Sequence, residues 1–221
     1  MMTIEAVIFD LDGLLVDSEP VWDRARAAMA ARYGRPWTQA DHFQVMGVST
    51  AEWVAYMIAR LELTLAPEAV AEEVIAQMAA LYRRQIPFRP GAVAAVQRAA
   101  AHYPTALASG SPRQLLDIVI QSAALAGCFT VVLSADEVGA GKPDPAVYLE
   151  TARRLGIPPT HCVCVEDSPH GVLAGRRAGM RVINVPDPRY PLTEAQAGHA
   201  DLVLASLAEL TLATLRGSTK V

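Results

Sequence analysis

The stretch IEAVIFDLDG at residues 4–13 combines a short apolar run with two acidic residues. Residues 4–9 are apolar apart from Glu5 and include β-branched side chains, a pattern typical of a strand buried on both faces. Asp10 follows this run, and Asp12 points the same way because side chains alternate along an extended chain. We therefore expect a core strand that carries two carboxylates at its C-terminal tip.

Two carboxylates this close repel each other unless a cation or a shared proton relieves the repulsion. Their roles can therefore separate, with one group ionised and the other able to hold a proton. Taken alone, the motif is also compatible with a simple Asx turn. A calcium loop of the EF-hand type is excluded, because it needs an oxygen ligand and a glycine where this chain has Leu14 and Leu15.

The pattern of apolar residues changes near residue 90. Residues 17–85 place apolar side chains at helical spacing, with breaks near 34–36 and 66–67. Beyond residue 90, short apolar strands alternate with helices. The strands are expected at 105–108, 131–134, 162–165 and 181–185, and the helices at about 91–101, 112–123, 144–155, 169–178 and 206–215.

Alternating strands and helices predict an α/β core built on a doubly wound, Rossmann-like parallel sheet. We expect residues 1–16 and 86–221 to form this catalytic core domain and residues 17–85 to form an inserted all-α helical cap domain. Open α/β sheets bind ligands at the C-terminal ends of their strands. The helical insertion is therefore a candidate lid, with hinges near Val16 and residues 86–90.

Composition narrows the classes of partner. The 221 residues are 52% hydrophobic and 19% charged, which excludes a disordered chain. A net charge of −4 and a pI of about 5.7 give no basic stripe for nucleic acid. The start lacks a signal sequence, no long apolar run could span a membrane, and three cysteines without CxxC spacing suit a reducing compartment. We expect a cytoplasmic monomer with no nucleic-acid or membrane partner.

A second motif, Ser109-Gly110-Ser111-Pro112, lies where a strand gives way to a helix. A serine hydroxyl, backbone N–H groups and a helix N-terminus together form an anion site of the kind that holds phosphate. The alternative is a plain capped helix, with Ser111 as N-cap and Pro112 in the first turn.

A third motif, Gly141-Lys142-Pro143, contains an unusual residue for this chain. Lysine and arginine together number 19, and only Lys142 and Lys220 are lysines. A lysine retained inside such an arginine-rich sequence indicates that a compact ammonium is needed, as when a cation bridges a carboxylate and a phosphate. With a single case, chance is an open alternative.

The fourth motif, Glu166-Asp167-Ser168-Pro169, ends a strand with two acids and opens a helix. Its carboxylates are candidate ligands for Mg²⁺, which prefers one or two carboxylates with a backbone carbonyl, waters and a phosphate. Capping of the following helix is the alternative for this motif alone. All four motifs fall at the C-terminal ends of predicted strands, and their residue types complement one another.

With these motifs in this order, the sequence resembles the haloacid dehalogenase-like hydrolase superfamily over nearly its whole length. The helical insertion resembles the C1-type cap of the superfamily. The stretch at residues 17–23 resembles its sugar-phosphatase members, such as the hexitol and 2-deoxyglucose-6-phosphate phosphatases, with β-phosphoglucomutase more distant. The resemblance implies a phosphatase that acts on a small phosphorylated metabolite, a sugar or polyol phosphate.

The resemblance also implies roles for the four acids. Asp10 would attack phosphorus and form an aspartyl-phosphate, while Asp12 would protonate the leaving oxygen and later activate water. Mg²⁺ would be held by the Asp10 carboxylate, the Asp12 carbonyl and Asp167, with Glu166 acting directly or through a water.

The remaining roles concern the phosphoryl group. The resemblance implies that Ser109 and the Gly110 N–H hold its oxygens, and that Lys142 neutralises its charge.

Other activities in the superfamily fit less well. Dehalogenases lack the second aspartate, and phosphonate-cleaving members use a cap lysine, which residues 17–85 do not contain. A phosphomutase shares the core residues, but a basic residue follows Gly-Val-Ser in its cap, where Gly47-Val48-Ser49 is followed here by Thr50. A catalytically silent phosphate-binding module is the alternative from another class.

Overall fold

The computed structural model describes residues 3–45, 49–189, 193 and 198–217. The chain divides into two compact units, Met1–Asp17 with Pro87–Val221 and Ser18–Ile86. The sequence-based boundaries at 16/17 and 85/86 differ from these by one residue each.

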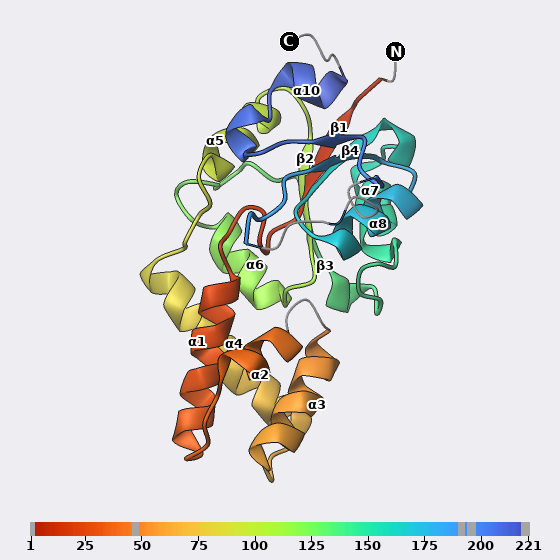
Figure 1. Ribbon diagram of the computed structural model, residues 1–221. Coiled ribbons are helices and arrows are strands. Elements are labelled where there is room, and N and C mark those ends of the chain that lie inside the picture. Colours follow the sequence, from red (N-terminus) through yellow and green to blue (C-terminus); the bar gives the residue numbers. More distant parts are fainter. Residues whose placement is uncertain (1–2, 46–48, 190–192, 194–197, 218–221) are drawn as a thin grey trace. The chain divides into compact units, whose positions relative to one another are not determined.

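The core unit is built on a six-stranded sheet in the order β3-β2-β1-β4-β5-β6, with every neighbouring pair parallel (Figure 1). The strands are β1 Ala6–Phe9, β2 Thr105–Ser109, β3 Val131–Ser134, β4 Cys162–Glu166, β5 Arg181–Asn184 and β6 Leu202–Val203. The doubly wound α/β prediction is confirmed. The two-residue edge strand β6 was not expected, because so short a pairing leaves no periodic pattern in the sequence.

The register of the central strands decides where the polar residues meet. Phe9 in β1 pairs with Leu107 in β2 on one side and with Val165 in β4 on the other. The residues that follow these positions therefore lie side by side at the C-terminal edge of the sheet. Burial of all four residues of β1 explains its unbroken apolar sequence.

Helices flank the core sheet. They are α5 Ala92–Ala100, α6 Arg113–Ile120, α7 Ala146–Leu155, α8 Pro169–Arg177 and α10 Leu212–Arg216, with short 3₁₀ turns η1 Ala135–Glu137, η2 Pro159–His161 and η3 Leu207–Glu209. Side chains of α7 and α8, among them Val147, Tyr148 and Val172, bury one face of the sheet in a shared apolar cluster with Ile8 and Ala106.

Two helix predictions need correction. The single helix expected at 206–215 is split into η3 and α10, because Thr211 leaves the helix and caps α10 through the Thr214 backbone N–H. Helix α6 begins at Arg113 with Pro112 as its N-cap. The proposed cap residue Ser111 is instead buried, and its N–H donates to Ser109 Oγ at 2.9 Å.

The second unit is helical in its described part, as expected. It contains α1 Glu19–Arg32, α2 Gln39–Gln44, α3 Thr50–Leu61 and α4 Pro67–Arg84. Its core includes Trp22 and Trp53, whose rings lie 6.1 Å apart. Gly47 and Val48, used above to compare phosphatases with mutases, lie outside the described residues. Ser49 caps α3, and Thr50 is its first residue.

The lengths of these helices bear on membrane insertion. Within the described part of the chain, none is both long and apolar enough to cross a bilayer.

Candidate active site

Asp10 and Lys142 form the centre of the site. Asp10 follows β1 directly, and its backbone N–H bonds to the Val165 carbonyl at 3.0 Å, which fixes it beside β4. Lys142 Nζ lies 2.5 Å from Asp10 Oδ1 and 3.2 Å from the Ala108 carbonyl. Both side chains are nearly buried, with 7% and 11% of their surface exposed. The ammonium is therefore held against one oxygen of Asp10.

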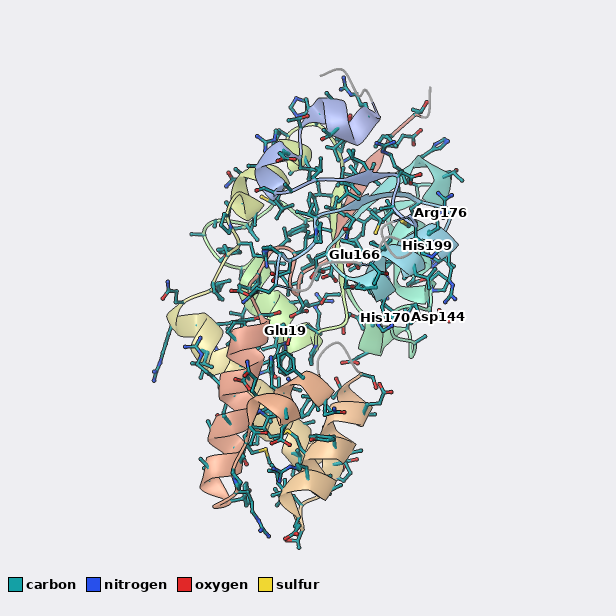
Figure 2. All side chains as sticks on the ribbon, in the orientation of Figure 1. Glu19, Asp144, Glu166, His170, Arg176 and His199 are labelled. Atoms are coloured by element: carbon teal, nitrogen blue, oxygen red, sulfur yellow. The ribbon has the colours of Figure 1, made fainter. Side chains whose placement is uncertain are left out.

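Glu166 lies at the end of β4 and is completely buried (Figure 2). Its Oε1 accepts from Lys142 Nζ at 2.6 Å, so the lysine bridges Glu166 and Asp10. Its Oε2 accepts from the backbone N–H of Asp167 at 3.1 Å and from that of Ser168 at 3.4 Å. A fully buried carboxylate is stable only with such partners.

Asp12 and Ser109 are joined by a hydrogen bond. Ser109 is the last residue of β2, and its Oγ donates to Asp12 Oδ2 at 2.8 Å. The other oxygen, Asp12 Oδ1, is buried, and no hydrogen-bond partner is found for it among the described residues. The serine therefore orients the carboxyl group while one of its oxygens is left available.

Asp167 and Gly13 meet closely at the edge of the sheet. Gly13 has φ +79°, and a Cβ at this position would lie 2.1 Å from Asp167 Oδ2. The DLDG turn thus needs glycine both for its backbone conformation and for the space that Asp167 takes. Asp167 Oδ1 is buried, again with no hydrogen-bond partner among the described residues.

The donor set fits a hard divalent cation. Oxygen atoms of Asp10, Glu166 and Asp167 all lie within 4.8 Å of one another. Mg²⁺ and Ca²⁺ both prefer such oxygen ligands. The unpaired buried oxygen of Asp167 is what a cation would satisfy, and Lys142 alone does not balance the four carboxylates. The acidic cluster therefore fits a metal site.

The pKa values of the clustered side chains reflect this excess of negative charge. Burial, with the Glu166 and Asp12 charges adding to it, raises the pKa of Asp10 to about 8 against the opposing effect of Lys142. Burial and the Glu166 and Asp10 charges also raise the pKa of Asp167 well above its usual range. Burial disfavours the Lys142 ammonium, yet Asp10 and Glu166 outweigh it and raise the lysine pKa.

The site residues predicted from the sequence thus come together, with one at its margin. The contacts above join four of the seven into one group, Asp10, Lys142, Glu166 and Asp167. Asp12 and Ser109 form a pair next to it, since Lys142 also contacts the carbonyl of Ala108, the residue before Ser109. Gly110 directly follows β2 and is exposed, and space around it is open, since a Cβ there would meet no atom within 4 Å. His170, which follows the fourth motif, is exposed (Figure 2).

Sequence reasoning missed Tyr148. Its hydroxyl donates to Glu166 Oε1 at 2.5 Å, and its ring lies 4.9 Å from Lys142 Nζ. Tyr148 lies on the apolar face of α7, and helical spacing alone therefore predicts an ordinary core residue at this position. A usable signal was available, because a buried tyrosine hydroxyl needs a hydrogen-bond partner.

Comparison with known proteins identifies the class that this fold and site define. Residues 4–179 match the haloacid dehalogenase-like hydrolase family, so the chain belongs to the haloacid dehalogenase-like hydrolases. It is 37% identical to hexitol phosphatase B of Escherichia coli (strain K12) over 223 residues, covering 97% of each chain.

Two further relatives agree with this assignment. The phosphorylated carbohydrates phosphatase of Thermotoga maritima is 33% identical over 181 residues, which cover 81% of this chain and 84% of that protein. The crystal structure of CbbY from Rhodobacter sphaeroides in complex with phosphate superimposes with a TM-score of 0.85 at 28% identity, covering 97% of this chain and 100% of that one. The chain is a phosphoric monoester hydrolase.

Proposed function

We propose that this protein is a Mg²⁺-dependent phosphatase that hydrolyses a small sugar or polyol phosphate through an aspartyl-phosphate on Asp10. The observation that supports it most is the lysine bridge, in which Lys142 Nζ contacts Asp10 at 2.5 Å and Glu166 at 2.6 Å. The names of the hexitol phosphatase and the phosphorylated carbohydrates phosphatase support the substrate class.

The first step is attack by an Asp10 carboxylate oxygen on phosphorus. A new oxygen–phosphorus bond forms while the ester oxygen–phosphorus bond breaks, and the leaving oxygen takes a proton from Asp12. In the second step water attacks the same phosphorus, Asp12 accepts the water proton, and the Asp10–phosphorus bond breaks. Free phosphate leaves and both carboxyl groups return to their starting state.

The hydrogen bond from Ser109 supports this assignment of Asp12. Ser109 Oγ donates a hydrogen bond to Asp12 Oδ2. We therefore assign the proton that Asp12 transfers to Oδ1, the oxygen for which no partner is found among the described residues. In this proposal Ser109 and the Gly110 N–H hold oxygens of the group being transferred, the role that the resemblance implies, and Lys142 neutralises part of its charge.

The residues proposed for Mg²⁺ are Asp10, the Asp12 carbonyl and Asp167, with Glu166 beside them. The buried, unpaired Asp167 Oδ1 supports a direct ligand there. Glu166 already accepts hydrogen bonds on both oxygens, which favours an indirect role through Lys142 or a water. Bound Mg²⁺ would supply positive charge that stabilises the transferring phosphoryl group.

Phosphate release tests the proposal. Wild type, Asp10→Asn and a matched surface control, Asp117→Asn, are assayed with hexitol phosphates, aldose phosphates and one activated aryl phosphate, with and without Mg²⁺. Asp117 pairs with Arg113 on the exposed side of α6. We expect Mg²⁺-dependent release by wild type and the control, with loss of at least about 1,000-fold in Asp10→Asn. No release from any ester would instead favour a mutase or a silent binding module.

A further inference from the structure

Tyr148 makes two contacts with the charged centre of the site and has no assigned role. It is completely buried on α7, within the apolar cluster that covers one face of the sheet. Its hydroxyl lies beside the buried Cys164 thiol and donates to Glu166 Oε1 at 2.5 Å. A hydrogen bond from a neutral hydroxyl to a buried carboxylate is among the stronger ones in proteins.

The same tyrosine also contacts the lysine. Lys142 Nζ lies 4.9 Å from the centre of the Tyr148 ring, within the range of a cation–π interaction. Glu166 Oε1 therefore has two donors, the Tyr148 hydroxyl and the Lys142 ammonium, and the tyrosine ring and the ammonium also contact each other. These three side chains form a closed triangle.

The far side of Glu166 is held as firmly. Its Oε2 accepts from the backbone N–H groups of Asp167 and Ser168, and its carboxyl group fills the space beside Gly171, where a Cβ would lie 1.9 Å from the carboxyl carbon. With its Oε2 side held in place, a hydrogen bond that fixes Oε1 also fixes the orientation of the whole Glu166 carboxylate. A group that fixes Oε1 also fixes where the lysine sits.

We propose that Tyr148 is a positioning residue that holds Lys142 on Asp10 by fixing Glu166 through its hydroxyl and flanking the ammonium with its ring. The inference rests on the proposed function, in which Asp10 and Lys142 act on the phosphoryl group. Without the hydroxyl, Glu166 Oε1 has one donor fewer and attracts the Lys142 ammonium more strongly. The ammonium then moves toward Glu166 and neutralises Asp10 and the transferring group less well.

The test separates this role from simple packing. Tyr148→Phe keeps the ring and removes only the hydroxyl. We expect kcat to fall about 10-fold or more, the scale of an outer partner in a catalytic site, while KM changes less than about 2-fold. The inhibition constant of orthovanadate, which adopts the trigonal geometry of phosphoryl transfer, should rise by a similar factor to the fall in kcat.

Tyr56 provides a matched control, because it makes the same kind of hydrogen bond outside the proposed site. Tyr56 in the helical unit also donates its hydroxyl to a buried carboxylate, Asp41, at 2.8 Å. Tyr56→Phe should lower the melting temperature and leave kcat unchanged. Tyr148→Met fills similar space with neither hydroxyl nor ring, so it should lose more activity than Tyr148→Phe and gives a second test if the phenylalanine variant folds poorly. All assays run below the melting temperature of each variant.

The outcomes are distinct. If Tyr148→Phe and Tyr148→Met keep wild-type kcat and vanadate inhibition while Asp10→Asn is inactive, the positioning role is wrong and the proposed function stands. If kcat of both variants falls only in proportion to the fraction of folded protein while the vanadate inhibition constant is unchanged, Tyr148 is a packing residue and the inference is again wrong. An inactive wild type would overturn the proposed function itself.

Discussion

Gly13 holds its backbone at φ +79° directly beside the Asp167 carboxylate. Two effects are combined here, the left-handed conformation and the lack of space, since a Cβ on this residue would lie 2.1 Å from Asp167 Oδ2. A left-handed non-glycine residue costs about 1–2 kcal/mol, and displacement of a reacting group by about 1 Å lowers rates about 100-fold. We expect Gly13→Ala to lose about 100-fold in kcat as well as stability.

Gly127→Ala is the control that separates the two effects. Gly127 has φ +75°, yet a Cβ there would meet nothing within 4 Å. It should therefore lower the free energy of unfolding by about 1–2 kcal/mol with unchanged kcat. Equal kcat values for the Gly13→Ala and Gly127→Ala variants, measured with thermal unfolding in parallel, would mean that the contact with Asp167 has no part in the reaction.

At the scale of elements, the cap helices α2 and α3 are joined through one buried acid. Asp41 caps its own helix with Thr38 and accepts from Tyr56 at 2.8 Å and Arg60 Nε at 2.7 Å. Burial raises the pKa of Asp41, but the hydrogen bonds from Thr38, Tyr56 and Arg60 outweigh it and lower the pKa to about 2. The ionised carboxylate therefore stabilises the folded unit.

The stability that Asp41 contributes depends on pH. Because the folded pKa lies below the usual 3.8, the stabilisation is complete above about pH 4 and is lost as pH falls toward 2. Asp41→Asn should be less stable than wild type by about 2 kcal/mol at neutral pH. The difference in melting temperature between the two proteins should shrink between pH 4 and 2. A difference that stays constant over this range would show that Asp41 acts through packing alone.

The sequence predicted most of these elements because each left a local signal. The apolar strand before Asp10 and the acids at the end of β4 predicted that these side chains lie at the C-terminal edge of the sheet, where the structure has them. In contrast, β6 is two residues long and depends only on pairing with β5. The break at Thr211 depends on a cap hydrogen bond, and the role of Tyr148 depends on a partner 18 residues away in sequence. Such features arise from tertiary contacts that periodicity does not record.

At the scale of the whole molecule, the chain passes between its two units twice, at 17/18 and at 86/87. The two crossings are paired within the core unit, where the Asp17 N–H bonds to the Pro87 carbonyl at 2.9 Å. Next to them, Asp187 accepts from Arg89 at 2.5 Å and from Arg189, which also pairs with Asp17. Both crossings are therefore tied to the loop after β5, at the same edge of the sheet as the proposed site.

In the proposed reaction Asp10 carries the phosphoryl group, and trapping the phosphorylated Asp10 tests this role most directly. Wild-type protein is mixed with its best phosphate ester and Mg²⁺, quenched in acid within the first turnover, digested and weighed by mass spectrometry. We predict that the peptide containing Asp10 gains the mass of one phosphoryl group, and that hydroxylamine removes it. Phosphate release without any phosphorylated Asp10 peptide, or with the phosphoryl group on another residue, would contradict the account.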